Sequence, residues 1–450
     1  MAVETRYART SDGTYVAYQV IGEGPPDIVL VRGWISNIEH EWAEPTLARI
    51  DRRLAATGRL IRLDRRGMGL SDRLSPQQLP TIESRLDDFV AVLDAVGARR
   101  AVMIGLGHAG GTTLCAMFAA VHPARTAGLV LFHPSARGAW APDYPWAQTD
   151  EQFERYVELV RGSWGTPELA AQWVRGGAPS RADDQALIQW FAEDQRLGGS
   201  AEDALALSRI DRETDIRDAL RSIHVPTLVI ARSDAHEDGS RYVADCIPGA
   251  RYTELAGQDT MALAGDTDAV LREIGTFVDG IPEAAAAEDD DRVLATVLFA
   301  DIVDSTARAV ELGDRRWAAL LDAERDCLRG LVARFRGREI DTAGDGYFAA
   351  FDGPGRAIRC ATTAVDAVRE LGLEIRIGLH TGECEERAGR LRGVAVHTGA
   401  RVAALAGSSE VLVSGTVKDL VAGSGFRFGD RGRHRLKGVP GEWPIYAVEP

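Results

Sequence analysis

Lysine is almost absent from this chain of 450 residues, because only Lys418 and Lys437 occur among 52 basic residues. Acidic residues are in excess, and the net charge at pH 7 is −15. Such a chain lacks the basic surface by which proteins bind nucleic acids or anionic membranes, so neither partner is expected. The sequence also shows no signal peptide and no apolar run of the roughly 18 residues that a membrane span needs.

Cysteine is equally sparse. The five thiols are odd in number and lack the paired spacing of a structural metal site. They predict reduced, mostly buried thiols in a cytoplasmic protein. These residues are Cys115, Cys246, Cys327, Cys360 and Cys384.

An acidic segment predicts the division of the chain. Residues 281–291 contain a run of alanines followed by a run of acidic residues, which suits an exposed linker and not a core. We therefore expect one domain over 1–280 and another over 292–450. The acidic excess lies before residue 292, and the second domain is close to neutral.

The first domain alternates short apolar runs with helical stretches. Buried parallel strands are expected at 27–33, 59–67, 101–107, 128–132 and 226–234, and a helix of 3.6-residue period at 81–97. This order predicts a doubly wound α/β sheet. The tryptophan-rich, polar residues from about 137 to 222 interrupt the alternation and predict a helical cap.

The second domain has a different order of elements. A strand ends in an acidic turn near 301–306, and a long helix follows at 315–335. A hairpin around 344–346 then leads to a helix at 356–371 and a strand at 373–382. The order β-α-β-β-α-β predicts an α+β, ferredoxin-like fold.

The segment 101–123 resembles the nucleophile elbow of the α/β-hydrolase fold, where the family carries Gly-x-Ser-x-Gly. Here the pentapeptide at 107–111 has Ala109 at the serine position. The resemblance places the triad acid at Asp234, and Thr260 stands where the family has its histidine. Acyl transfer needs a nucleophile and a base, so we expect a catalytically degenerate, regulatory domain.

Two other functions of this domain are consistent with its sequence. His108 could act as base or nucleophile, and Ser71 or Ser233 could supply a substitute hydroxyl, which would make the domain an esterase with an unusual nucleophile. Without catalysis, the pocket beneath the cap is expected to bind a small apolar or ester-like ligand and to report it to the second domain.

Two aspartates mark a candidate metal site in the second domain. Asp301 ends a buried strand, and Asp345 lies at the tip of a hairpin. Carboxylates on adjacent strands repel each other unless a cation lies between them. Mg²⁺ favours such oxygen ligands and is commonly shared with substrate phosphates.

Residues 293–448 resemble the class III nucleotidyl cyclases. The motif F-x-D-I-x-x-S-T is matched around Asp301, and the G-D-G hairpin around Asp345. The resemblance implies two Mg²⁺ or Mn²⁺ ions per site, with the backbone carbonyl of Ile302 as a further ligand. It also implies that Lys437, in the segment GRHRLKGVPGEWPIYAV, binds the triphosphate.

The resemblance also assigns a transition-state helix at 393–402. His397 and Arg401 are four residues apart and share one helix face. The family usually has asparagine and arginine here, so Arg401 matches and His397 departs. Both are expected to stabilise charge at the α-phosphate and ribose.

The residues at the two positions that select the base also differ from those of the family. Adenylate cyclases usually carry lysine where this chain has Asp341, and aspartate where it has Arg390. ATP is the expected substrate, but GTP or relaxed specificity stays open, and reduced activity is expected.

In this family each site takes its metal ligands from one subunit and its transition-state residues from the other, which implies a head-to-tail homodimer. The whole chain resembles the mycobacterial fusions of an α/β-hydrolase domain to an adenylate cyclase. We therefore expect a cytoplasmic enzyme that forms 3′,5′-cyclic AMP and pyrophosphate. A non-catalytic sensor of nucleotide or ligand is the remaining alternative.

Overall fold

The computed structural model describes residues 3–33, 35–73, 79–107, 110–235, 239–281, 292–387, 389–421 and 423–449. The chain divides into two compact units at residue 290. All five cysteines are free. Within the described ranges, no helix has the length and apolar character to cross a membrane.

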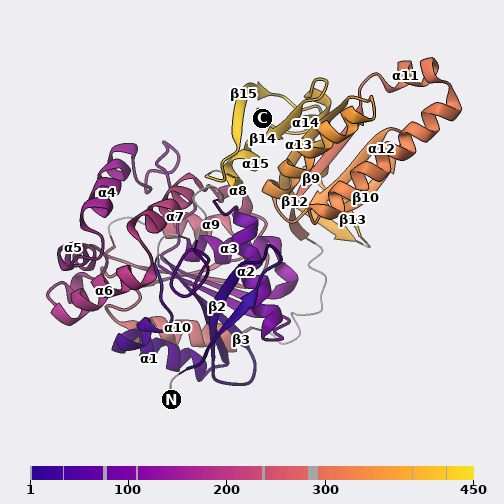
Figure 1. Cartoon of the computed structure of the whole chain (residues 1–450). Coiled ribbons are helices and arrows are strands. Elements are labelled where there is room, and N and C mark those ends of the chain that lie inside the picture. The colour runs from indigo at the N-terminus through magenta and orange to yellow at the C-terminus, as the bar shows by residue number, and fades with distance from the viewer. Residues whose placement is uncertain are drawn as a thin grey trace. The chain divides into compact units, whose positions relative to one another are not determined.

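An eight-stranded sheet forms the centre of the N-terminal unit (Figure 1). Its order is β1-β2-β4-β3-β5-β6-β7-β8, and the pairings from β4 to β8 are parallel. The expected doubly wound sheet is confirmed. The strands are β1 Thr5–Arg9, β2 Tyr15–Ile21, β3 Asp27–Arg32, β4 Arg59–Leu63, β5 Ala101–Leu106, β6 Thr126–Phe132, β7 Thr227–Arg232 and β8 Arg251–Leu255.

The apolar runs of the sequence predict β3 to β7 but not β1, β2 and β8. The predicted strands are almost wholly buried and therefore appear as continuous apolar runs. β1 and β8 are partly exposed along their length, so charged and apolar residues alternate irregularly in them. The sheet extends beyond its apolar centre on both sides.

Helices pack on this sheet. α1 (Pro45–Ala55) and α10 (Thr267–Asp279) share the main apolar core with alternate residues of β3 to β7. α3 (Gly111–Val121) lies close against β5, because a Cβ on Gly105 would lie 2.7 Å from the Cα of Thr112. The remaining helices of the unit, outside the cap, are α2 Ile82–Ala95, α8 Arg217–Leu220 and α9 Gly239–Cys246.

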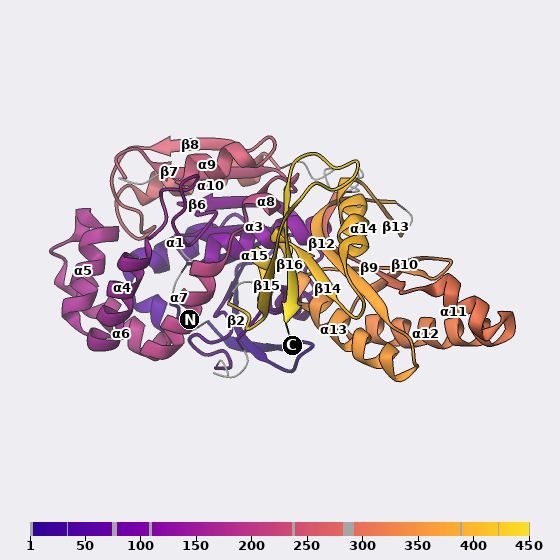
Figure 2. The same ribbon diagram turned by 90° about the horizontal axis from the view of Figure 1, so that it is seen from above.

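Four helices lie together at one end of the unit, within residues 137–222 (Figure 2). Each begins at a residue whose side chain accepts a backbone N–H of the first turn, so the sequence itself marks the helix starts. These cap helices are α4 Asp150–Ser163, α5 Pro167–Gly177, α6 Gln185–Gly198 and α7 Ala201–Glu213. Short 3₁₀ turns occur at His40–Ala43, Pro123–Arg125 and Pro179–Arg181.

The C-terminal unit has its own sheet, in the order β10-β11-β9-β12-β14-β16-β15, with β13 beside β12. The first four strands are antiparallel neighbours, so the expected β-α-β-β-α-β fold is confirmed. The strands are β9 Arg292–Ile302, β10 Arg338–Ala343, β11 Gly346–Phe351, β12 Ile375–Arg387, β13 Arg390–Arg392, β14 Val411–Ser414, β15 Arg427–His434 and β16 Trp443–Glu449.

The two faces of this sheet carry different helices. Even-numbered residues of β9 pack in a core with α12 (Asp314–Arg334) and α13 (Pro354–Glu370). Odd-numbered residues such as Val297 pack towards α14 (Val394–Leu405). Side chains alternate along a strand, so Asp301 projects on the α14 face. The shorter helices are α11 Ser305–Leu312 and α15 Gly415–Leu420.

A buried histidine of β12 gives the C-terminal unit a predicted pH dependence. His380 is hydrogen-bonded through Nδ1 to Ser414 Oγ at 2.8 Å, and burial lowers the pKa of His380 to about 4. The folded state therefore holds a neutral ring, whereas the unfolded state takes up a proton below about pH 6.5. The free energy of unfolding therefore decreases as the pH falls, by about 2 kcal/mol between pH 7 and pH 5.

The measurement is the free energy of unfolding of the full chain at pH 7 and pH 5. The His380→Gln variant is expected to lose about 2 kcal/mol less than the wild type over this interval. Equal losses in both proteins would refute the assignment.

Candidate functional site

Two aspartates lie at the same end of the paired strands β9 and β11. Asp301 pairs in register with Gly346 of β11, and Asp345 immediately precedes that glycine in the hairpin turn. Ile302 is the last residue of β9 and is buried. The fold thus brings these three residues to the same end of the central strands.

An arginine that the sequence analysis missed lies beside this pair. Arg376 of β12 is in register with Asp301, and its Nε donates to Asp301 Oδ2 at 3.1 Å, with a second, shorter contact from Nη2. The sequence feature that could have identified Arg376 is its charge within the otherwise apolar strand at 375–379. The ion pair partly offsets the negative charge of the Asp301 carboxylate.

The surroundings of Asp345 are acidic. Glu324 of α12 is buried, which raises its pKa to about 7; Arg325 opposes this rise, and Asp345 adds to it. Glu324 was also absent from the sequence prediction. Glu324 and Asp345 thus influence each other electrostatically at the hairpin, with Arg325 beside them.

A cavity of about 290 Å³ opens between this strand end and α14. Asp301, Asp341 and Arg376 line it, with Phe348 of β11 and Ala400 of α14 among the other lining residues. Asp341 thus lines the same cavity as Asp301, the first of the two expected metal ligands. Arg390, the other expected base-selecting residue, is exposed on β13, a strand that contacts β10.

The expected transition-state residues lie on the exposed side of α14. His397 and Arg401 are both exposed, one turn apart. Arg401 Nε donates to the backbone carbonyl of Lys437 at 3.2 Å, so the structure brings these two residues together. Among the described residues, no hydrogen bond or ion pair joins Arg401 to Asp301 or Asp345.

The residues at the end of β9 fit a divalent cation. Two carboxylates supply the oxygen ligands that Mg²⁺ and Mn²⁺ favour. In the described part of the chain, no group of three or more His, Cys, Asp and Glu side chains could hold a metal ion. Ligands beyond the two carboxylates must therefore come from backbone carbonyls, water or substrate phosphates.

The hydrolase-like elbow is crowded by charged side chains. His108 and Ala109 lie outside the described residues, but Gly110 has a φ of 64°, which favours glycine. A Cβ on Gly110 would overlap Arg65 and come 2.8 Å from Asp211 Oδ2. Asp211 also accepts from Arg85 at 2.9 Å. Arg65 and the Arg85–Asp211 ion pair thus lie beside the glycine that follows the serine position of hydrolases.

The residues at the other two triad positions, Asp234 and Thr260, make separate hydrogen bonds to the backbone. Thr260 lines the cavity beneath the cap, and its N–H donates to the Gly177 carbonyl at 2.9 Å. Asp234 is exposed, and its N–H donates to the Gly257 carbonyl at 3.0 Å. No hydrogen bond joins Asp234 to Thr260 in the described ranges.

Neither of the two serines considered as substitute nucleophiles, Ser71 and Ser233, presents its hydroxyl to the cavity. Ser71 is buried, donates to the Asp64 carbonyl at 2.6 Å and accepts from the Ala17 N–H at 2.8 Å. Its hydroxyl is therefore committed to the backbone. Ser233 is exposed and outside the cavity lining.

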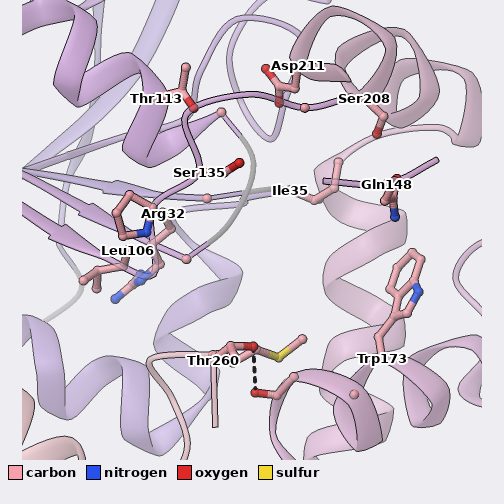
Figure 3. Close-up of a pocket in the computed structure, with 18 of the residues that line it drawn as sticks. Arg32, Ile35, Leu106, Thr113, Ser135, Gln148, Trp173, Ser208, Asp211 and Thr260 are labelled. Atoms are coloured by element: carbon pink, nitrogen blue, oxygen red, sulfur yellow. Dashed lines mark hydrogen bonds between the residues drawn. The ribbon is translucent and has the colours of Figure 1, made fainter. Parts of the chain in front are cut away.

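The cavity beneath the cap has a volume of about 770 Å³, within the range of ligand pockets (Figure 3). Arg32 and Leu106 approach it from the ends of the strands, and Gln148 and Trp173 from the cap side. The cap helices contribute a largely aromatic wall, comprising Phe153, Tyr156, Trp173, Trp190 and Phe191.

Comparisons with known proteins match the two units separately. Residues 26–252 match the family model of the alpha/beta hydrolase fold. Residues 287–450 match the model of the adenylate and guanylate cyclase catalytic domain.

Individual relatives divide in the same way. A putative adenylate cyclase 3 of Rhizobium meliloti is 30% identical over 171 residues, covering 36% of this chain and 29% of its own. Epoxide hydrolase B of Mycobacterium tuberculosis is 33% identical over 116 residues, covering 24% of this chain and 30% of its own. The chain therefore spans less than a third of either relative. The crystal structure of a Pseudomonas aeruginosa hydrolase superposes with a TM-score of 0.51 at 24% identity, covering 62% of this chain and 99% of that one.

Proposed function

Because the chain belongs to the alpha/beta hydrolase fold family and also carries an adenylate and guanylate cyclase catalytic domain, we propose that it is a ligand-regulated nucleotidyl cyclase. The proposed reaction converts ATP to 3′,5′-cyclic AMP and pyrophosphate. The observation that carries this proposal is the position of Asp301 and Asp345 at the same end of β9 and β11, with Asp301 lining a cavity.

Asp301 and Asp345, with the Ile302 carbonyl, would hold Mg²⁺ or Mn²⁺. Two such ions would activate the ribose 3′-hydroxyl and offset the charge of the pyrophosphate leaving group. Arg401 and His397 donate to the oxygens on which charge develops at the α-phosphate. Lys437 binds the triphosphate as a compact positive charge.

Two chains are needed to complete this site in the proposal. Arg401 is exposed and contacts Lys437, Asp301 contacts Arg376, and among the described residues no hydrogen bond or ion pair joins Arg401 to Asp301. This separation supports a head-to-tail homodimer, in which the Arg401 and Lys437 of one subunit face the aspartates of the other.

The base preference is proposed to be adenine with reduced discrimination. Asp341 lines the cavity and offers an acceptor to the adenine amino group. A carboxylate can equally accept from guanine N1 and N2, so GTP is the alternative substrate. The charges at Asp341 and Arg390 are the reverse of those in the usual lysine–aspartate pair.

The N-terminal unit is proposed to bind a ligand and regulate the cyclase. Arg65 and the Arg85–Asp211 ion pair lie beside Gly110, and Thr260 supplies no base. Both features argue against ester hydrolysis. A large cavity is nevertheless retained under the cap.

The test incubates the purified full chain with Mn²⁺ and either ATP or GTP and identifies the products. We expect cyclic nucleotide and pyrophosphate, with more product from ATP. Asp301→Asn is expected to lower the rate at least about a hundredfold. Asp304→Asn is a matched control, because Asp304 is exposed in the same turn and has a φ of 52°, which asparagine tolerates.

Absence of cyclic product from both nucleotides would overturn the proposal. Turnover of p-nitrophenyl esters by the same preparation, abolished in His108→Ala, would favour the esterase instead.

A further inference from the structure

Two polar side chains of cap helix α6 line the 770 Å³ cavity, and each has an atom without a hydrogen-bond partner among the described residues. Asp194 and Gln195 are 5% and 1% exposed. Among the described residues, Asp194 Oδ1 and Gln195 Nε2 have no hydrogen-bond partner. Buried polar groups are nearly always partnered, so two adjacent exceptions on a cavity wall point to a ligand.

The orientation of the Gln195 amide is fixed by a neighbouring loop. Its Oε1 accepts from the backbone N–H of Gly165 at 3.0 Å, so the carbonyl end is committed. The amide nitrogen therefore presents donors and needs an acceptor. A ligand that meets this need carries an oxygen or another acceptor.

Asp194 has the opposite requirement. Its carboxyl group offers a carbonyl acceptor even when protonated, and it lies in an acidic environment because Glu41 and Asp64 act on it electrostatically. Arg32 and Arg62 oppose these acids, but both arginines already pair with Glu41. Burial and the two neighbouring acids raise the pKa of Asp194 well above its ordinary value. Glu41 and Asp64 would repel a carboxylate ligand at this position, so a neutral head group is favoured.

We propose that the cap cavity binds a neutral carboxamide with an apolar, aromatic body, whose N–H donates to Asp194 and whose carbonyl accepts from Gln195. An amide places a donor beside an acceptor without net charge, as these two side chains require. Its apolar body packs against the aromatic wall that includes Trp173, Trp190 and Phe191.

This inference deepens the ligand-binding part of the proposed function and rests on it. Binding is measured directly on the full chain, so a failed cyclase assay and a failed binding assay are separate results.

The experiment compares biphenyl-4-carboxamide with biphenyl-4-carboxylate by isothermal titration calorimetry and thermal unfolding. The two probes share one body and differ in the head group. We expect the amide to bind at least about tenfold more tightly and to raise Tm, because only the amide supplies both a donor and an acceptor.

Two variants test the head-group contacts. Asp194→Leu is expected to abolish the preference for the amide and to raise the Tm of the ligand-free protein, since it removes a buried carboxyl group without a hydrogen bond at Oδ1. Gln195→Glu keeps the acceptor for the Gly165 N–H and replaces the donor that faces the ligand, so the amide should bind about tenfold more weakly. Gln189→Leu is the control, because Gln189 lies on the exposed side of the same helix.

A merely structural role for Asp194 predicts a lower Tm for Asp194→Leu and unchanged binding of the amide. That result overturns the proposal, as does equal binding of the two probes or the absence of binding by the amide.

Discussion

Neither Asp301→Asn nor Arg401→Ala is expected to form cyclic nucleotide alone, whereas an equal mixture should recover about a quarter of the wild-type rate. In the proposed head-to-tail dimer, each site takes its aspartates from one subunit and Arg401 from the other. Random pairing makes about half of the dimers mixed. One of the two sites in a mixed dimer then carries both native residues.

The measurement is the rate of cyclic AMP formation after the two variants are mixed and allowed to exchange subunits. The matched control mixes Asp301→Asn with Asp345→Asn. These residues lie at the same end of the paired strands β9 and β11, so both changes fall on the same side of the shared site. No recovery is expected in that control. Equal recovery in both mixtures, or in neither, would contradict a site shared between Asp301 and Arg401.

Arg62→Met is expected to destabilise the N-terminal unit by about 3–5 kcal/mol. Arg62 is 1% exposed, donates to Glu41, and pairs with Asp51 at 2.9 Å. Asp51 is 0% exposed, and burial raises its pKa even with Arg32 and Arg62 beside it. Removing Arg62 leaves buried carboxylates short of positive charge, which is more costly than the loss of an exposed ion pair.

The measurement is the thermal unfolding of the full chain, in which we expect the transition of the N-terminal unit to fall by roughly 10 °C. Arg59→Met is the matched control on the same strand, because Arg59 pairs with Asp27 at 2.6 Å but is 29% exposed at its side chain. Its cost is expected to be below about 1 kcal/mol. Similar losses in the two variants would show that burial does not set the strength of this network.

Local patterns were sufficient for much of the fold. The strands β3 to β7 are buried over nearly their whole length, so their apolar runs are visible in the sequence. The hairpin tip at Gly344 and Asp345 combines a residue with φ of 64° and a polar neighbour, and such turns have local signatures. β1 and β8 were missed because partly exposed strands lack these runs.

Pairings between distant residues could not be predicted in the same way. The contacts of Asp301 with Arg376 and of Arg401 with Lys437 depend on strand register and loop position. Asp211 reaches Gly110 from a cap helix a hundred residues further along the chain. No spacing rule along the sequence specifies such approaches.

The sequence by itself determined the chemistry available to this protein. It has carboxylates at Asp301 and Asp345, where a metal is proposed, and it lacks a serine nucleophile at Ala109 and a histidine base at Thr260. Only the tertiary structure decided which groups meet and which stay unsatisfied. It placed Asp301 in the cavity with Asp341, and it left Asp194 and Gln195 with hydrogen-bonding atoms unpartnered among the described residues. The reason is that residue type fixes the donors, acceptors and charges, whereas hydrogen bonding and burial depend on segments brought together by folding.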